Sequence, residues 1–246
     1  MKAMILAAGY ATRMGHLAMD RPKALLPVAG RPVLDYLMQA IHSIPSMRQV
    51  SLVTNQRFFG NFQEWAGEHR NSQVRIINDG TNTNEKRLGA IADLRLAIDQ
   101  SVADDDVLIA AADNIFMLSF PGFAHFFAHH GTDCITAHRE TDIEKLRNTG
   151  VIEMDETGRV ISFEEKPDHP RSLYASPPLY ILKCDTLPLI SEYLDENNNP
   201  DAPGHFFAWL ADRRPLHAFV FEEARYSIGD EHSYHRACEI FSRDNS

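Results

Sequence analysis

Short apolar runs alternate with amphipathic segments along the first half of the chain. The apolar runs predict buried strands, and the segments with apolar residues at helical spacing predict helices. The predicted strands are residues 2–8, 49–54, 74–78 and 106–113, and the predicted helices are residues 33–44, 58–69 and 85–99. This order is typical of a parallel sheet that is covered by helices on both faces.

The pattern changes after about residue 130. Predicted strands cover residues 133–139, 149–155, 159–165, 179–183 and 216–221, and predicted helices lie near residues 184–194, 204–213 and 231–242. Asp155 and Gly158 are turn residues between two of these strands and predict a hairpin.

Together the two patterns predict an α/β fold with a doubly wound, mostly parallel Rossmann-like sheet, followed by a mixed α/β half. We expect one domain over residues 1–246, with a doubly wound, nucleotide-type half at 1–130 and a mixed α/β half at 131–246. The second half is expected to pack on the same sheet.

Size and composition are ordinary for a globular protein. The chain has 246 residues, of which 44% are hydrophobic and 24% charged, which suits one larger α/β domain or two small ones. No apolar run reaches the roughly 20 residues that span a bilayer, and the first ten residues are too quickly polar for a signal peptide. Three widely spaced cysteines, without a CxxC pair, favour a reducing cytoplasm over disulfides or a zinc site.

The net charge of −10 argues against broad binding of nucleic acid, which depends on Lys and Arg. A small anionic ligand needs only a local cluster of positive groups. The acidic run at residues 104–106 is interpreted as a solvated turn.

The loop after the first strand, AAGYATRMG, is the first candidate site. Its small residues allow a ligand to approach the backbone, whose N–H groups can bind phosphate oxygens. Arg13 adds a planar donor fork suited to phosphate. Lys23 follows in a segment stiffened by Pro22 and Pro27.

Two further candidates fall where parallel strands end, which is where ligands gather in such sheets. Asp113 ends an apolar strand and is well placed to hold Mg²⁺ against phosphates, or else caps a turn through Asn114. Glu165 and Lys166 follow another strand and precede a proline, a pattern that also suits a surface turn. The histidines of residues 125–130 lack ligand spacing, so they are interpreted as an amphipathic helix surface.

These segments resemble the sugar-1-phosphate nucleotidylyltransferases. That family has LAGG or LAAG, then G-T-R, then PK-x-LLPV, and this chain has LAAGYATRM followed by RPKALLPV. The likeness continues in RLGAIADL, in AADN, in TGVIEMDETGRVISFEEKP and in the closing RYSIGD. The opening also looks like that of muramic acid 1-phosphate uridylyltransferases, which gives a mild preference for a pyrimidine triphosphate.

The resemblance implies Mg²⁺-dependent transfer of a nucleoside monophosphate from a nucleoside triphosphate to a sugar 1-phosphate or a similar acceptor. It implies that Arg13 and Lys23 are catalytic and that Asp113 binds Mg²⁺. Acceptor binding is implied for Gly150, Glu165 and Lys166. The residues implied to bind the nucleotide are Leu6, Ala7, Ala8, Gly9, Asn84 and Gly89.

The chain departs from the family pattern in three places. The amide that would read the base is Asn84 where the family has Gln, and a glycine on the sugar side is replaced by Pro178. The second metal-binding Asp falls at Ser227, and Asp230 is a candidate to replace it.

Three other functions remain open. A glycosyltransferase would normally carry D-x-D at the end of a strand, whereas Asp104 and Asp106 precede one. A nucleotide-binding domain without turnover is favoured by Ser227. An NAD-binding Rossmann domain lacks its GxGxxG here. The base, the acceptor, the pathway and any oligomer are left open.

Overall fold

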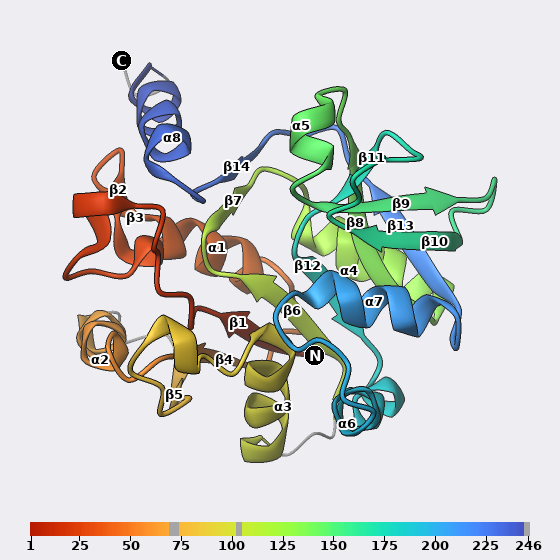
Figure 1. The fold of residues 1–246 in the computed structure, drawn as a ribbon, viewed down its shortest axis with the longest axis horizontal. Helices are drawn as coiled ribbons and strands as arrows, with labels where there is room; N and C mark the ends of the chain where they lie inside the picture. The colour runs from red at the N-terminus through yellow and green to blue at the C-terminus, as the bar shows by residue number, and fades with distance from the viewer. Residues whose placement is uncertain (69–73, 102–104, 244–246) are drawn as a thin grey trace.

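A computed structural model describes residues 1–68, 74–101 and 105–243 (Figure 1). Its centre is a 10-stranded sheet in which four strands of the first half are parallel neighbours. In sheet order these are β6 (Val107–Ala111), β1 (Lys2–Leu6), β4 (Gln49–Thr54) and β5 (Val74–Asn78). The predicted parallel sheet is therefore confirmed.

The first strand lies between two partners, which fixes where its loop begins. Leu6 is in register with Val53 of β4 and with Ala111 of β6. The residues after Leu6 and Ala111 consequently leave the sheet side by side at its carboxyl edge. The opening loop and Asp113 start from this edge.

The second half extends the same sheet with mostly antiparallel pairs. Beyond β6 come β12 (Leu179–Leu182), β8 (Asp133–Arg139), β11 (Tyr174–Ser176), β9 (Gly150–Met154) and β10 (Val160–Glu165). Strand β13 (Leu216–Val220) pairs with β8 in parallel. The mixed second half thus packs on the first through a shared sheet, as the sequence indicates.

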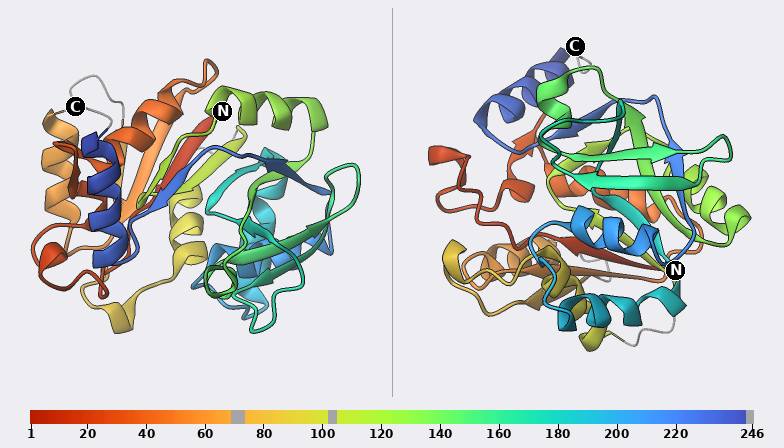
Figure 2. Two further views of the ribbon diagram at one scale, coloured as in Figure 1. Left: turned by 90° about the horizontal axis from the view of Figure 1, so that it is seen from above. Right: turned by 45° about the vertical axis from the view of Figure 1, so that its right-hand side comes forward.

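Helices cover both faces of the sheet (Figure 2). One hydrophobic core contains side chains of α1 (Val33–His42), α2 (Phe59–Glu68) and α4 (Phe120–His130). The other contains side chains of α3 (Ala90–Gln100), α6 (Pro188–Asp195) and α7 (Pro203–Ala211). Two separate cores on opposite faces are what a doubly wound sheet requires, because each face must bury its apolar side chains.

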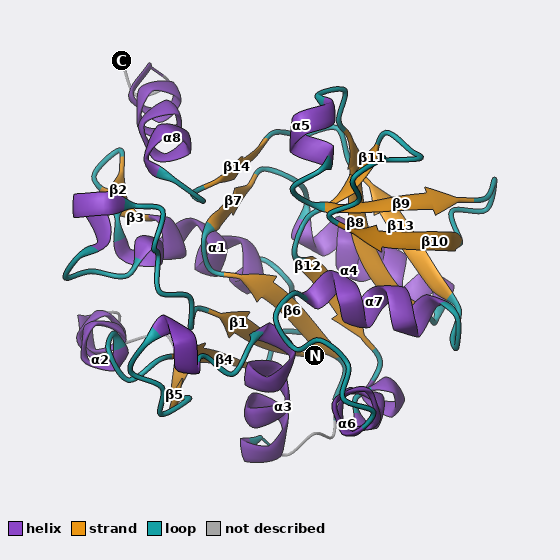
Figure 3. Ribbon diagram, in the orientation of Figure 1, coloured by secondary structure: helices purple, strands orange, loops and turns teal. Residues whose placement is uncertain are grey.

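The sequence missed several short elements (Figure 3). They are the 3₁₀ turns, the pair β2 (Pro27–Val28) and β3 (Arg31–Pro32), the pair β7 (Asn114–Phe116) and β14 (Arg225–Ser227), strand β11 and helix α5 (Ile143–Leu146). Such elements are too short to show a period. The last helix, α8 (Glu231–Arg243), was predicted and packs in a third core with Met14, Val33 and Ile228.

Two predicted helices begin later than expected. The helix predicted from residue 85 begins at Ala90, after a 3₁₀ turn at Asn84–Lys86 and an extended stretch. Gly89 has a φ of +96°, a conformation that glycine tolerates. Because residues in a helix have negative φ, a helix cannot run through Gly89 from the residues before it. The helix predicted at 184–194 is a 3₁₀ turn followed by α6, which starts at Pro188.

Among the residues that the structure describes, no helix is long and apolar enough to cross a membrane. The interpretation of residues 104–106 as a solvated turn is only partly covered, since Asp104 lies outside the described residues. Asp105 is close to the amino group of Met1, at 2.8 Å.

Candidate active site

The loop after β1 leaves an open surface at Gly9. No heavy atom lies within 4 Å of the position that a Cβ of Gly9 would occupy. The loop is held from below, because Asn55 donates a hydrogen bond from Nδ2 to the carbonyl oxygen of Ala8, at 2.9 Å. Tyr10 is buried under the loop and pairs with Thr81 across 2.8 Å between the two hydroxyl oxygens. The structure thus presents a firmly held loop with free space above its glycine.

Arg13 lies beside the loop that leads into α8. A side chain added at Gly229 would come within 3.7 Å of Nη2 of Arg13 and within 3.8 Å of Oγ of Ser227. The Arg13 side chain itself is exposed. The structure therefore brings Arg13 to Ser227, the position where the family pattern has its second metal-binding carboxylate.

Lys23 and Asp113 form an ion pair between Nζ and Oδ2. Their side chains are 23% and 18% exposed, so the pair lies partly buried but open to solvent. The other carboxylate oxygen of Asp113, Oδ1, accepts a hydrogen bond from Asn114 at 2.8 Å. The two residues are 90 positions apart in the chain, and the parallel register of β1 and β6 is what brings their segments together.

Asp113 would supply one carboxylate to a magnesium site. Ser227 lies opposite Asn114 in the β7–β14 pair, and its neutral hydroxyl does not supply the negative charge of the Asp that the family pattern has at this position. Over residues 1–68, 74–101 and 105–243, no group of three or more His, Cys, Asp or Glu side chains could hold a metal ion. One carboxylate still suits Mg²⁺, which binds through one or two carboxylates together with water and substrate phosphates.

Asp230 has a structural task at the start of α8. Its Oδ1 accepts a hydrogen bond from the backbone N–H of Ser233 at 2.8 Å, in the manner of a helix N-cap. That bond and the side chain of Ser233 lower the pKa of Asp230, and the charge of Arg13 acts in the same direction. Its predicted metal role stays a prediction.

Glu165 and Lys166 lie at the end of β10, in the second half of the chain. The Glu165 side chain is 10% exposed, and burial raises its pKa. Lys166 is 58% exposed, and its Nζ lies 3.8 Å from Oε1 of Glu165. Lys166 has a φ of +50°, a conformation that is uncommon for a side chain larger than glycine. Backbone in this region is a recurrent feature of ligand sites.

Two glycines make room for Glu165. A Cβ at Gly150 would lie 2.7 Å from the Phe163 ring and 3.4 Å from Oε2 of Glu165. A Cβ at Gly204, on α7, would lie 1.9 Å from the same oxygen. The structure therefore shows a packing reason for Gly150, while its predicted contact with the acceptor stays a prediction. The contact of Gly204 with Glu165 was not predicted from the sequence.

The segment predicted to bind the base, residues 84–89, packs against residues 200–201. Asn84 starts the 3₁₀ turn, and Arg87 binds Asp201 through two hydrogen bonds, from Nε at 2.9 Å and from Nη2 at 2.5 Å. Gly89 packs so closely on Pro200 that an added Cβ would lie 2.6 Å from its carbonyl oxygen. The segment before α3 is thereby tied to the segment before α7.

Two carboxylates near this segment, Asp93 and Asp79, were not identified from the sequence. Asp93, in the first turns of α3, is 5% exposed, and its Oδ1 has no hydrogen-bond partner among the described residues. Burial and, to a smaller extent, the charge of nearby Asp79 raise its pKa to about 7. Asp79 accepts from the N–H and hydroxyl of Thr81, at 2.6 and 2.8 Å. The available signal was that Asp93 shares the inner face of α3 with Leu94 and Ala97.

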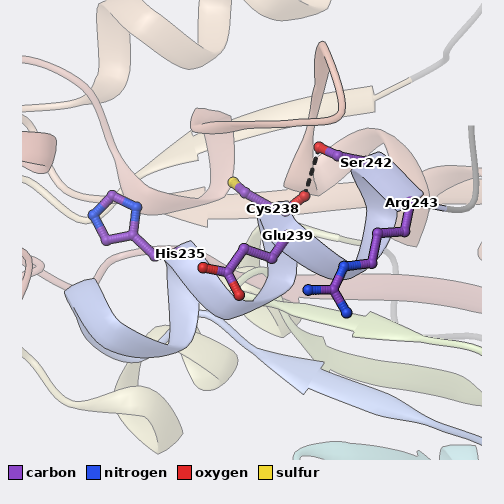
Figure 4. Close-up of a pocket in the computed structure, with 5 residues that line it drawn as sticks. All are labelled: His235, Cys238, Glu239, Ser242 and Arg243. Carbon is purple, nitrogen blue, oxygen red and sulfur yellow. Dashed lines mark hydrogen bonds between the residues drawn. The ribbon is translucent and has the colours of Figure 1, made fainter. Parts of the chain in front are cut away.

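A hollow of about 480 Å³ lies elsewhere, on α8 (Figure 4). It is lined by His235, Cys238, Glu239, Ser242 and Arg243. None of these residues belongs to the groups described above. The histidines of residues 125–130 lie on α4, as predicted, and the ring of His130 is 4.4 Å from that of His217.

Comparison with known proteins adds to this geometry. The model of the family described as nucleotidyl transferase matches residues 2–242. The chain is 27% identical over 198 residues to a glucose-1-phosphate thymidylyltransferase of Actinoplanes, covering 76% of this chain and 59% of that protein. It is 23% identical over 252 residues to a glucose-1-phosphate adenylyltransferase of Thermotoga neapolitana, covering 96% and 59%. The chain spans about half to three-fifths of the length of the curated relatives it matches.

Solved structures share the fold. A UDP-glucose pyrophosphorylase in complex with UDP-glucose superposes with a TM-score of 0.83 at 19% identity, covering 99% of this chain and 98% of that one. A likeness of this degree establishes the fold.

Proposed function

Because this chain belongs to the nucleotidyl transferase family, we propose that it transfers a nucleoside monophosphate from a nucleoside triphosphate to a sugar 1-phosphate or similar phosphorylated acceptor. The observation that carries the proposal is the ion pair of Lys23 with Asp113. Arg13 lies near Gly229, and the preceding residue, Ile228, donates from its backbone N–H to the carbonyl oxygen of Asp113 at 2.8 Å. The names of the relatives, which act on glucose 1-phosphate, support the class of acceptor.

In the proposed reaction, an oxygen of the acceptor phosphate attacks the α-phosphorus in line. The new bond is P–O to the acceptor, and the bond to the β-phosphate oxygen breaks, releasing pyrophosphate with its electron pair. Such transfers need positioning and neutralisation of charge more than a protein nucleophile. Cations near the reacting phosphorus therefore determine the rate.

Each cation has a position that suits one task. Lys23 is proposed to bind a phosphate that Mg²⁺ would link to Asp113, because the two side chains are paired. Arg13, which is exposed, is proposed to bind the departing pyrophosphate. Lys166, also exposed, is proposed to orient the acceptor phosphate, and Glu165 to accept hydrogen bonds from the acceptor's hydroxyl groups. Mg²⁺, bound through Asp113, would neutralise phosphate charge.

The base and the cellular location are proposed from sequence features. The opening sequence favours a pyrimidine triphosphate, and Asn84 is the proposed reader of the base. Cys134, Cys184 and Cys238 are free thiols, which suits a reducing cytoplasm.

The proposal is tested by pyrophosphate release. ATP, GTP, CTP, UTP and dTTP would each be combined with a panel of sugar 1-phosphates, with and without Mg²⁺. Asp113→Asn tests the site, and Asp99→Asn, on the outer face of α3, is the matched control. Release that needs one triphosphate, one acceptor and Asp113 supports the proposal.

One other function is favoured by an observation. With Ser227 in place of a carboxylate, the chain could bind a triphosphate without turning it over. Saturable triphosphate binding without pyrophosphate release from any pair would establish that alternative.

A further inference from the structure

Arg225 is a cation on the floor of the site that the proposed reaction does not use. It is the first residue of β14 and lies opposite Phe116 of β7. Its Nη1 donates a hydrogen bond to Oδ1 of Asn114 at 2.9 Å. Asn114 in turn donates to Asp113, at 2.8 Å. Arg225 is thus linked through one buried amide to the carboxylate at the reaction centre.

The guanidinium of Arg225 has donors to spare. An arginine offers five N–H groups, and within residues 1–68, 74–101 and 105–243 the hydrogen bond to Asn114 is the one recorded for its side chain. Burial lowers the pKa of Arg225, and the Asp113 carboxylate is the largest influence in the opposite direction. The residue remains partly accessible to solvent. A charge in such a place is costly unless a counter-charge reaches it.

The nearby carboxylates are already engaged. Asp113 is paired with Lys23. Glu140, which also acts on Arg225, accepts from the N–H groups of Thr141 and Asp142 at 2.9 Å, and its other oxygen lies 3.4 Å from Lys145. His138, another neighbour, is kept neutral, since burial and, to a smaller extent, the charge of Arg225 lower its pKa to about 4. Within residues 1–68, 74–101 and 105–243, no carboxylate forms a hydrogen bond or an ion pair with Arg225.

The position of Arg225 points to the acceptor rather than to the triphosphate. Tyr180, on β12, is influenced by the charges of both Glu165 and Arg225, so it lies near both. Arg13 instead lies near Gly229 and Asp230, which follow Ser227 in the chain. Along β14 the two arginines consequently flank Ser227, with Arg225 toward the residues predicted to bind the acceptor.

We propose that Arg225 binds a second anionic group of the acceptor, a carboxylate or a second phosphate, in addition to the phosphate that attacks. The inference rests on the proposed function and narrows its acceptor to sugar phosphates that carry another negative charge. The guanidinium fork matches the paired oxygens of either group. Binding would bring a paired counter-charge to a half-buried cation.

The test compares three acceptors that differ in one group. Glucose 1-phosphate has no second anion, glucuronic acid 1-phosphate has a carboxylate, and glucose 1,6-bisphosphate has a second phosphate. We expect a charged acceptor to exceed glucose 1-phosphate in kcat/KM by about 10- to 100-fold, the usual effect of a charged hydrogen-bonding pair. The preferred one of the two identifies the group that Arg225 binds.

Variants connect the preference to Arg225. Arg225→Gln keeps a donor for Asn114 but loses the charge, and we expect it to bring the ratio of kcat/KM values to within about threefold of unity. Arg225→Lys keeps the charge without the fork and should lie between. Arg95→Gln, on the surface of α3, is the control and should leave the ratio as in the unmodified protein.

Binding measured by calorimetry keeps the test independent of turnover. If no pair of substrates is turned over, the proposed function fails, yet tighter binding of a charged acceptor that depends on Arg225 would still support the inference. Equal binding of all three acceptors to the unmodified protein overturns the inference. So does an equal loss for every acceptor in Arg225→Gln, which would assign Arg225 to the attacking phosphate or to the fold.

Discussion

Replacing Asp93 by Asn should stabilise the protein, and the gain should grow with pH. The amide has nearly the shape of a protonated carboxyl group but cannot ionise. Asp93 is buried in α3 with one oxygen unpaired and with Asp79 nearby. An ionised carboxylate here would be buried and close to the charge of Asp79, so the folded protein retains the proton of Asp93 to higher pH.

The size of the effect follows from the pKa. Burial raises the pKa of Asp93 from 3.8 to about 7, so folded molecules bind a proton that unfolded molecules have already released. The contribution of Asp93 to the free energy of unfolding is fully present below pH 3.8 and is lost as pH rises through 7. Relative to low pH, the raised pKa lowers the free energy of unfolding by roughly 0.5 kcal/mol at pH 4, roughly 2 kcal/mol at pH 5 and roughly 4 kcal/mol at pH 8.

Urea unfolding of the two proteins at pH 4, 5, 6, 7 and 8 measures the difference directly. Comparing variant with parent at each pH cancels the other titrating groups. Asp99→Asn is the control on the same helix, where the side chain is 60% exposed and pairs with Arg95 at 3.5 Å. An exposed pair of this kind contributes about 1 kcal/mol or less.

A difference in unfolding free energy that stays constant, within about 0.5 kcal/mol, from pH 4 to pH 8 would contradict this prediction. Such a result would mean that Asp93 ionises normally in the folded protein. A loss of stability in Asp93→Asn at pH 8 would point to an unrecognised donor that requires the carboxylate.

Three further predictions concern the site and its supports. Arg13→Ala should lower kcat with every acceptor by about 10²- to 10³-fold, whereas Lys166→Ala should mainly raise the acceptor KM, by about 10-fold. Steady-state kinetics distinguish these two effects. Equal, mild effects of the two variants would contradict both roles. Gly204→Ala should push Glu165 aside, raise the acceptor KM and cost about 1–3 kcal/mol, which kinetics and urea unfolding would show, and an unchanged KM would count against Glu165. Ser119→Ala should cost about 1 kcal/mol, because Oγ accepts from the N–H of Gly122 at 3.0 Å at the start of α4; the same unfolding assay would contradict this if stability were unchanged.

The architecture could be predicted from the sequence. Strands such as residues 49–54 and helices such as residues 33–44 have clear periods, and a period depends only on which faces of an element are buried. The candidate residues Arg13, Lys23 and Asp113 could also be identified from the sequence, since each follows or lies near a predicted strand end. The resemblance supplied their roles, and the matching family model supports the class of reaction.

Tertiary structure decided how residues distant in the chain meet. The pairing of Lys23 with Asp113 depends on the register of β1 and β6, and the pairing of Arg87 with Asp201 depends on the docking of α3 beside α7. Neither sheet register nor helix docking leaves a periodic signal. For the same reason the burial of Asp93 and the packing of Gly204 against Glu165 appear only in the folded molecule.

Arg225 shows the division most clearly. In the sequence it is one of 24 basic residues of an acidic protein, in a short strand without a period. Only the antiparallel pairing of β14 with β7 places it at Asn114, beside Asp113 and Tyr180. Local periodicity specifies which segments become strands and helices, but the chemical environment of a charge is set by groups from the whole chain, because burial and charge act through space.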